Sequence, residues 1–455
     1  MDLTKFFKAK SIAIIGVSKN PNKIGHVVFR NLLDGHYPGK IYIVNPNADR
    51  VLNYRSYKSV LDIKEPVELA VCCVPAELSL QALEHCGKKG IKDVVMITAG
   101  FREIGNFKLE EKLVKILDKY KIKIIGPNCL GTLDAHTKLD TLFLPRYRMK
   151  RPKPGSISFA CQSGAIASTI LDLATTEGYG FAKVISYGNA LNVDESDILE
   201  YLGNDEETKV ICLYLEGIKH GKKFIEVAKK VTKKKPVIAI KGGITEAGSK
   251  ATLSHTGSLA GNAAIYSGMF KQVGIIHAAS LEEMFNAARI LEKAVQPKGN
   301  RVQIITNGGG YGIITTDAIV NNNLVLANMD EKNKKALRKV FPPIVVVSNP
   351  MDLVGDATTE RYRLAIDAAL NDNNVDILIV LVLMQTPLIT PDIIDIISEF
   401  DELRKKPIIC VATGGEFTMT LRKSLEENGV PCFTFPESAV RAVKQLVEYY
   451  VDGKK

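Results

Sequence analysis

His255 stands in a long segment of small polar residues, a setting in which a histidine can take part in phosphate chemistry. The segment follows Lys241-Gly242-Gly243 and runs from Ser249 to Gly261, with a hydroxyl residue on either side of the histidine. Hydroxyl and backbone N–H groups bind phosphate oxygens, and glycine gives the chain freedom to move. The alternative is an ordinary polar loop histidine. None of the other six histidines has such a setting, and His26, at the start of a helix, is the nearest rival.

Glu216 is a candidate orienting group for that imidazole. It directly follows the apolar run Val210 to Leu215, so its carboxylate is expected at the carboxyl edge of a sheet. From there it can accept one imidazole N–H and leave the other ring nitrogen nucleophilic. A solvated acid at the end of a strand is the competing interpretation, and the residues alone leave both open.

The run Ser158 to Ala165 predicts a strand, a turn and a helix, and its turn is suited to phosphate. Ser163 and Gly164 put a hydroxyl and unpaired backbone N–H groups at a helix N-terminus, where an anion is stabilised. A serine hydrolase is the rival interpretation. Its nucleophile elbow has the pattern G-x-S-x-G, and Cys161 stands where that pattern has its first glycine, so the sequence disfavours a hydrolase.

Two further turns are candidate walls of a site. Gly16 and Ser18 leave a strand and Gly25 falls near the start of the next helix, an arrangement that lets backbone N–H groups approach a pyrophosphate. The spacing is not G-x-G-x-x-G, and Asn45-Pro46-Asn47 stands where NAD-binding proteins have a ribose-binding acid. The turn therefore favours another adenine diphosphate, or is a plain tight turn. Gly126-Pro127-Asn128 follows the last strand of the same series.

The C-terminal third contains a glycine run, Asn307 to Gly312, and the sequence Asn349-Pro350-Met351-Asp352-Leu353. The glycine run is similar to an anion-binding loop but lacks the Lys-Ser/Thr pair of a P-loop. We expect an interface or structural role for it.

These residues must be positioned by alternating strands and helices. Short apolar runs alternate with stretches of helical periodicity along the chain, which predicts an α/β fold of open parallel sheets covered by helices on both faces. Polar, proline-containing breaks near Arg151 and Gly299 divide the pattern into three modules, and we expect domains at residues 1–148, 152–297 and 300–455. The predicted strands are Ile12 to Ile15, Ile41 to Val44, Leu69 to Val74, Val94 to Ile97, Ile122 to Ile125, Ser156 to Ala160, Val210 to Leu215, Val237 to Ile240, Val302 to Thr306, Ile377 to Leu383 and Ile408 to Ala412.

The composition narrows the function classes. With 455 residues, 46% of them hydrophobic and 24% charged, the chain is an ordinary globular protein. The net charge of +10 makes nucleic-acid binding one function class to consider, but the lysines are spread over helical stretches. No helix-turn-helix, stacking aromatic motif or arginine cluster accompanies them, so we expect no nucleic-acid partner.

Cysteine usage and hydropathy exclude other classes. The eight cysteines include no C-x-x-C pair, so we expect no metal site and no redox motif, and Cys72, Cys73 and Cys212 should be small buried strand residues. The N-terminus is polar and the longest apolar run, Ile377 to Met384, is too short to span a bilayer. We expect a cytoplasmic protein without a membrane partner.

Together and in this order, the motifs resemble the α subunit of ADP-forming acyl-CoA (acetyl-CoA) synthetases, within the succinyl-CoA synthetase superfamily. The resemblance extends over essentially the whole chain, and the third module distinguishes it from the shorter succinyl-CoA synthetase α subunit. Tyr311 is one departure, since relatives often have Pro there. The most specific motifs are Ser254-His255-Thr256-Gly257, Cys161-Gln162-Ser163-Gly164-Ala165, Gly126-Pro127-Asn128-Cys129 and Asn349-Pro350-Met351-Asp352-Leu353.

The resemblance implies a Rossmann-like CoA-binding domain, then a flavodoxin-like ligase-CoA domain with the phosphohistidine, then a second flavodoxin-like domain. It also implies that acyl-CoA, ADP and phosphate give the free acid, CoA and ATP through an acyl phosphate and a phosphohistidine. By motif matching, His255 is the phosphorylated residue and Glu216 its orienting carboxylate. The implied contacts of phosphate or acyl phosphate are Ser163, Gly164 and Asn128, and those of CoA are Gly16, Ser18, Val74, Pro75 and Ala99.

A partner is implied as well. The chain reaches Lys455 without an ATP-grasp pattern, so we expect a separate ATP-grasp β subunit to bind ADP and Mg²⁺ in an α₂β₂ heterotetramer. One alternative is a protein acyltransferase whose inactive synthetase domains sense CoA, but such chains have an appended transferase domain. Another is a CoA-binding regulatory protein without catalysis, which the intact His255 and Glu216 disfavour. The residues do not reveal which acid is used.

Overall fold

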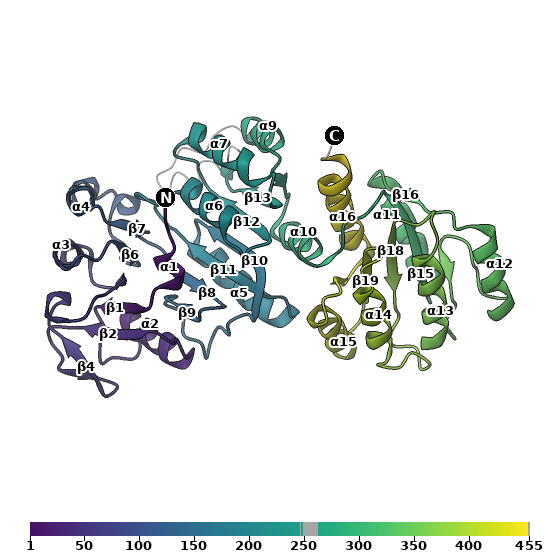
Figure 1. The fold of residues 1–455 in the computed structure, drawn as a ribbon, viewed down its shortest axis with the longest axis horizontal. Coiled ribbons are helices and arrows are strands. Elements are labelled where there is room, and N and C mark those ends of the chain that lie inside the picture. The colour runs from purple at the N-terminus through teal and green to yellow at the C-terminus, as the bar shows by residue number, and fades with distance from the viewer. Residues whose placement is uncertain (246, 249–262, 454–455) are drawn as a thin grey trace. The chain divides into compact units, whose positions relative to one another are not determined.

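The computed structural model describes residues 1–245, 247–248 and 263–453, so His255 lies outside the described residues. The described chain forms two compact units, Met1–Thr176 with Gly180–His277, and Glu177–Tyr179 with Ala278–Lys455. Helices flank the strands of three mostly parallel sheets, two in the first unit and one in the second (Figure 1). The predicted α/β fold with three open sheets is confirmed.

The first sheet has a Rossmann strand order. Its strands are β1 (Ser11–Ile15), β2 (Lys40–Val44), β3 (Arg50–Val51), β4 (Tyr54–Tyr57), β5 (Leu69–Cys72), β6 (Asp93–Met96) and β7 (Lys123–Ile125), and its helices are α1 (Lys5–Lys8), α2 (Ile24–Asp34), α3 (Ala76–Lys89) and α4 (Phe107–Tyr120). They pair in the order β3-β4-β2-β1-β5-β6-β7, and only β3 with β4 is antiparallel. Without β3 this is the order 3-2-1-4-5-6, which reverses between β1 and β5.

β1 shows why these strands are apolar along their whole length. Ile12 and Ile14 belong to one buried cluster, and Ala13 and Ile15 belong to another. Successive side chains of a strand point to opposite faces, and helices and loops cover both faces here. A strand buried on two sides needs an apolar residue at every position.

The second sheet is flavodoxin-like with two added strands. Its elements are β8 (Gly131–Asp134), β9 (Leu139–Asp140), β10 (Pro154–Cys161), α5 (Gly164–Glu177), β11 (Phe181–Ser186), α6 (Glu195–Asn204), β12 (Val210–Leu215), α7 (Gly221–Val231), β13 (Val237–Lys241), α9 (Ala263–Val273) and β14 (Ile276–His277). The order is β14-β13-β12-β10-β11-β8-β9, which reverses between β10 and β12. β8 and β9 precede the basic break at Arg151 and still join this sheet, where β8 pairs with β11 in antiparallel register.

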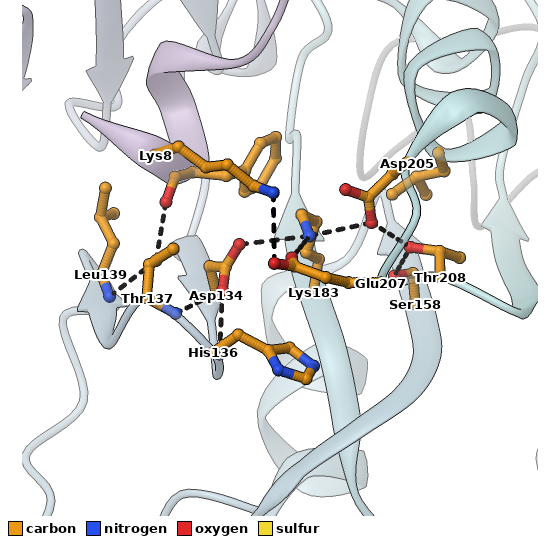
Figure 2. Close-up of polar contacts among 12 residues, drawn as sticks. Lys8, Asp134, His136, Thr137, Leu139, Ser158, Lys183, Asp205, Glu207 and Thr208 are labelled. Carbon is orange, nitrogen blue, oxygen red and sulfur yellow. Dashed lines mark hydrogen bonds and ion pairs between the residues drawn. The ribbon is translucent and has the colours of Figure 1, made fainter.

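β11 contains a buried charge that the apolar runs did not predict. Lys183 is fully buried, and its ammonium group lies 3.2 Å from Asp134, its cross-strand neighbour, and 2.9 Å from Asp205 (Figure 2). Glu207 completes the cage at 2.5 Å and also pairs with Lys8 of α1 at 3.2 Å. Burial by itself lowers the pKa of a lysine, but here the surrounding carboxylates outweigh it and the pKa of Lys183 is raised.

The second unit contains the third sheet. Its elements are α10 (Leu281–Lys293), β15 (Arg301–Thr306), α11 (Gly309–Asn321), β16 (Val325–Leu326), α12 (Glu331–Val340), β17 (Met351–Asp352), α13 (Thr359–Leu370), β18 (Ile377–Leu381), α14 (Ile393–Glu402), β19 (Ile408–Val411), α15 (Glu416–Glu427), β20 (Cys432–Phe433) and α16 (Pro436–Val447). The order β16-β15-β18-β19-β20, with β17 also beside β15, is flavodoxin-like and entirely parallel.

Two asparagines of the third module hold this sheet together. The side chain of Asn349 donates to the carbonyls of Val302 and Ala327 at 2.8 and 2.9 Å, and accepts from the Ile304 N–H. Asn307, the first residue of the glycine run, accepts from Leu383 N–H at 2.8 Å through its side-chain oxygen. Both motifs therefore have structural contacts within the sheet. In the part of the chain that the structure describes, no helix has the length and apolar character that crossing a bilayer requires.

Candidate functional site

The loops at the two reversal points of the first unit line one cavity of about 1180 Å³. In open α/β sheets, ligands bind outside the carboxyl ends of the strands at such points. Every predicted site residue that the structure describes lines this cavity, and His255 is outside the described residues. The nine are Gly16, Ser18, Val74, Pro75, Ala99, Asn128, Ser163, Gly164 and Glu216.

The first wall of the cavity is the tight turn after β1. Gly16 has φ +100°, which disfavours any residue with a side chain. A Cβ on Gly25, in the first turn of α2, would lie 2.3 Å from the carbonyl oxygen of Gly16, so the helix approaches the turn as closely as its backbone permits. His26 Nδ1 lies 2.7 Å from the Ser18 carbonyl oxygen, a contact that fixes the turn. His26 is therefore a structural residue of the turn.

Asn45 occupies the place where an NAD-binding protein has its ribose-binding acid. Its amide donates to the carbonyl of Val17 at 2.7 Å and so holds the same turn from the β2 side. Asn45 has no carboxylate with which to accept hydrogen bonds from the two ribose hydroxyls, as the Asp or Glu of an NAD-binding protein does. The position of the ribose-binding acid is thus taken by an amide that stabilises the turn.

The second wall is the N-terminus of α5. Ser163 directly precedes the helix, its carbonyl accepts from Ala167 N–H at 3.1 Å, and its hydroxyl accepts from Ile166 N–H at 3.4 Å. The first backbone N–H groups of a helix have no intrahelical acceptor and stabilise an anion. Ser163, Gly164 and Ala165 all line the cavity, so these groups can serve a phosphate there.

Asn128 connects the two walls. Its backbone has φ +58°, its N–H donates to the Thr98 carbonyl at 2.9 Å, and its side-chain amide lies 3.4 Å from Asn189 Oδ1. Asn189 in turn donates to Glu103 at 2.6 Å, and Glu103 accepts from the N–H groups beside Ala99. A chain of hydrogen bonds therefore links the expected CoA contact at Ala99 to the expected phosphate contact at Asn128.

Glu216 lies at the carboxyl end of β12 and is 6% exposed. The neighbouring groups show that its environment has low polarity. Burial raises the pKa of the nearby Tyr214 to about 12, and the negative charge of Glu216 adds to this shift. Burial also lowers the pKa of Lys241, and Glu216 opposes that shift. A carboxylate in such surroundings interacts strongly with any charged or polar group brought beside it.

The cavity suits an anionic ligand. Among its described lining residues, Lys23, Arg102 and Lys219 are cationic, while Glu216 is the one acid. The guanidinium of Arg102 is held by Glu110, with Nε 2.6 Å from the carboxylate. Lys219 donates to the carbonyl of Asn189 at 2.9 Å.

Sequence reasoning missed several lining residues, among them Lys23, Arg102, Asn189, Lys219 and Gln162. Lys219 follows Glu216 by three positions, so the sequence already places it in the loop after the same strand. Asn189 follows β11, a strand that the apolar runs do not predict, and Gln162 has no predicted role of its own within the motif Cys161-Gln162-Ser163-Gly164-Ala165.

Three known protein families match successive parts of the chain. Residues 10–135 match the family described as a CoA binding domain, residues 154–291 match the succinyl-CoA ligase like flavodoxin domain, and residues 302–445 match the ligase-CoA domain.

Whole proteins match as well. The α subunit of the ADP-forming acetate–CoA ligase II of Pyrococcus furiosus is 43% identical over 98% of this chain and 97% of its own length. The ADP-forming acetate–CoA ligase of Methanocaldococcus jannaschii is also 43% identical, but this chain spans only 62% of its length. In structure, the dinucleotide-forming acetyl-coenzyme A synthetase 1 of Ca. Korarchaeum cryptofilum, determined with phosphate and ADP, matches with a TM-score of 0.92 at 36% identity, over 100% of this chain and 99% of that one.

Proposed function

This chain belongs to the family of ADP-forming acetate–CoA ligases, and we propose that it acts as the α subunit of such an enzyme. The proposed reaction converts acyl-CoA, ADP and phosphate into the free acid, CoA and ATP. The single observation that supports it best is the cavity of the first unit, which gathers the expected CoA contacts, the expected phosphate contacts and Glu216.

In the proposed mechanism the turn at Gly16 and Ser18 binds the diphosphate of CoA, with Val74, Pro75 and Ala99 along the rest of the cofactor. The thioester then lies near the N-terminus of α5. A phosphate oxygen attacks the thioester carbonyl, the carbon–sulfur bond breaks, and CoA leaves as a thiol after taking up a proton. Ser163, Gly164 and Asn128 hold the phosphate in this step and stabilise the charge on its oxygens.

His255 acts next. Its unprotonated ring nitrogen attacks the phosphorus of the acyl phosphate, the bond from phosphorus to the acyl oxygen breaks, and the carboxylate leaves. Glu216 accepts the hydrogen bond of the other ring N–H and stabilises the positive charge that develops on the ring. Phosphohistidine then passes its phosphoryl group to ADP, which gives ATP.

The partner and the remaining assignments complete the proposal. ADP and Mg²⁺ bind on a separate ATP-grasp β subunit, in an α₂β₂ heterotetramer in the cytoplasm. Within the chain, residues 1–148 form the CoA-binding domain, residues 152–297 the domain of the phosphohistidine, and residues 300–455 the third domain.

Binding measurements test the first part of this proposal. Calorimetric titration of the full chain should show CoA binding and no NAD binding, because the Gly16 turn lacks the ribose-binding acid. ATP formation from acetyl-CoA, ADP and phosphate should require the β subunit. NAD binding without CoA binding, or robust ATP formation by this chain alone, would contradict the proposal.

A further inference from the structure

Gln162 joins the two strands on either side of the reversal point in the second sheet. The parallel pairing of β10 with β12 ends at Cys161 opposite Tyr214, and the Gln162 N–H donates to the Tyr214 carbonyl at 3.3 Å. Beyond this point the strands diverge, so the backbone N–H groups of Glu216 and Gly217 lack partners in β10. The side-chain oxygen of Gln162 accepts both, with 3.1 Å to Gly217 N.

These two bonds fix the orientation of the carboxamide. Only the oxygen can accept, and the reverse orientation would place an NH₂ group against two N–H donors. The nitrogen must therefore point away from the loop of Glu216. Within the described residues Nε2 has no hydrogen-bond acceptor, and Gln162 lines the cavity.

The residues around Gln162 indicate which ligand group its side-chain nitrogen can donate to. Ser163 follows it directly, and the first turn of α5 and the carboxylate of Glu216 line the same cavity. An amide NH₂ at this place adds a side-chain donor to the backbone donors of the helix N-terminus. The ligand chemistry that uses such a set of donors is a phosphoryl group with several oxygens.

We propose that Gln162 is both a positioning residue and a phosphoryl-binding residue: its oxygen fixes the backbone of Glu216, and its nitrogen donates to an oxygen of the phosphoryl group bound at α5. The inference rests on the proposed function. One amide thus sets the distance between the phosphoryl group and the carboxylate that orients the histidine. Loss of a hydrogen bond to a charged oxygen weakens binding about 10- to 100-fold.

Two substitutions separate the two roles. Gln162→Glu keeps an oxygen acceptor for the two N–H groups and replaces the donor with a negative charge. Gln162→Met is close in size and loses both functions without adding charge. Gln81→Glu, on the exposed surface of α3, makes the same chemical change outside the cavity and serves as the control.

The test is calorimetric titration of the full chain with inorganic phosphate and with CoA, beside thermal unfolding. Gln162→Glu should lose phosphate affinity at least about 10-fold, with CoA affinity and unfolding close to those of the unchanged chain and of Gln81→Glu. Gln162→Met should lose phosphate affinity and also unfold at a lower temperature. Unaltered phosphate affinity in both variants, or equal losses for phosphate and CoA, would overturn the inference. If the unchanged chain bound neither ligand, the proposed function itself would fail.

Discussion

Gly25→Ala is the substitution with the most direct steric consequence for the proposed CoA site. The added Cβ would lie 2.3 Å from the carbonyl oxygen of Gly16 and 2.8 Å from its carbonyl carbon, whereas ordinary van der Waals contacts begin at 3.4 Å. Both neighbours are backbone atoms, so no side chain can rotate away. The start of α2 and the Gly16 turn must therefore separate by about an ångström, which costs about 1–3 kcal/mol of stability.

The same displacement should disrupt CoA binding. Backbone N–H groups of the turn and of the first turn of α2 bind a diphosphate only while both stay in place. Loss of one charge-assisted hydrogen bond corresponds to a fall of about 10- to 100-fold in affinity. We therefore expect Gly25→Ala to bind CoA at least about 10-fold more weakly in a calorimetric titration.

Gly221→Ala is the matched control. Gly221 begins α7, its φ is not positive, and a Cβ there meets nothing within 4 Å. This variant should keep its CoA affinity and gain up to about 1 kcal/mol of stability. CoA affinity that is unchanged in Gly25→Ala would refute the placement of the cofactor at this turn.

Three further outcomes are expected. Glu216→Gln should slow phosphoryl transfer at least about 10-fold in a labelling time course and leave the CoA dissociation constant unchanged, because it removes the orienting charge only; equal effects on both would contradict its role. Transfer should also weaken as the pH falls below the ordinary histidine pKa of about 6.5, since protonated His255 has no nucleophilic nitrogen, and a pH-independent rate would argue against it. Lys183→Met should lower the free energy of unfolding by about 3–5 kcal/mol in urea titrations, against about 1 kcal/mol or less for Lys8→Met, the exposed neighbour. The raised pKa of Lys183 means that its stabilisation is fully present below the ordinary lysine value of 10.5 and is lost as the pH rises through its own higher pKa. In Lys183→Met the buried carboxylates lack their cation and must take up protons to become neutral. The difference in free energy of unfolding between this variant and the unchanged chain should therefore shrink in acid. A difference that does not change with pH would refute the role of Lys183 as the cation that compensates these carboxylates.

Much of the fold could be predicted because buried parallel strands are apolar at every position. All eleven predicted strands are present within a few residues of their expected bounds, and β12 has the bounds expected, Val210–Leu215. The turns that follow these strands then locate the carboxyl edge. This is why Gly16, Ser163 and Glu216 could be named from the sequence.

β11 escaped prediction because a lysine stands at its centre. Lys183 is buried only because three carboxylates from other segments surround it, and no local pattern records that compensation. With the strand missed, Gly188 and Asn189 at its carboxyl end were missed too. β8 was not predicted for a similar reason, because it contains a buried polar residue. Thr132 is fully buried, and its hydroxyl forms a hydrogen bond with the hydroxyl of Thr141 at 3.0 Å.

The cavity itself could not be predicted from local patterns. Periodicity identifies the carboxyl edge of each sheet but not which edges line a common space, and the cavity depends on two sheets that share one unit. One smaller expectation was wrong in part. Cys72 and Cys212 are buried on strands, whereas Cys73 follows β5, is half-buried and lines the cavity.

Phosphorylation of His255 is the central claim, and labelling of the full chain tests it most directly. The chain is incubated with radioactive phosphate and acetyl-CoA, and the label is then exposed to acid and to alkali. A phosphoramidate is lost in acid and survives alkali, so we predict an acid-labile, alkali-stable label that is absent from His255→Ala, although that variant still binds CoA. A label that is stable in acid, or one that persists in His255→Ala, would show that another residue receives the phosphoryl group.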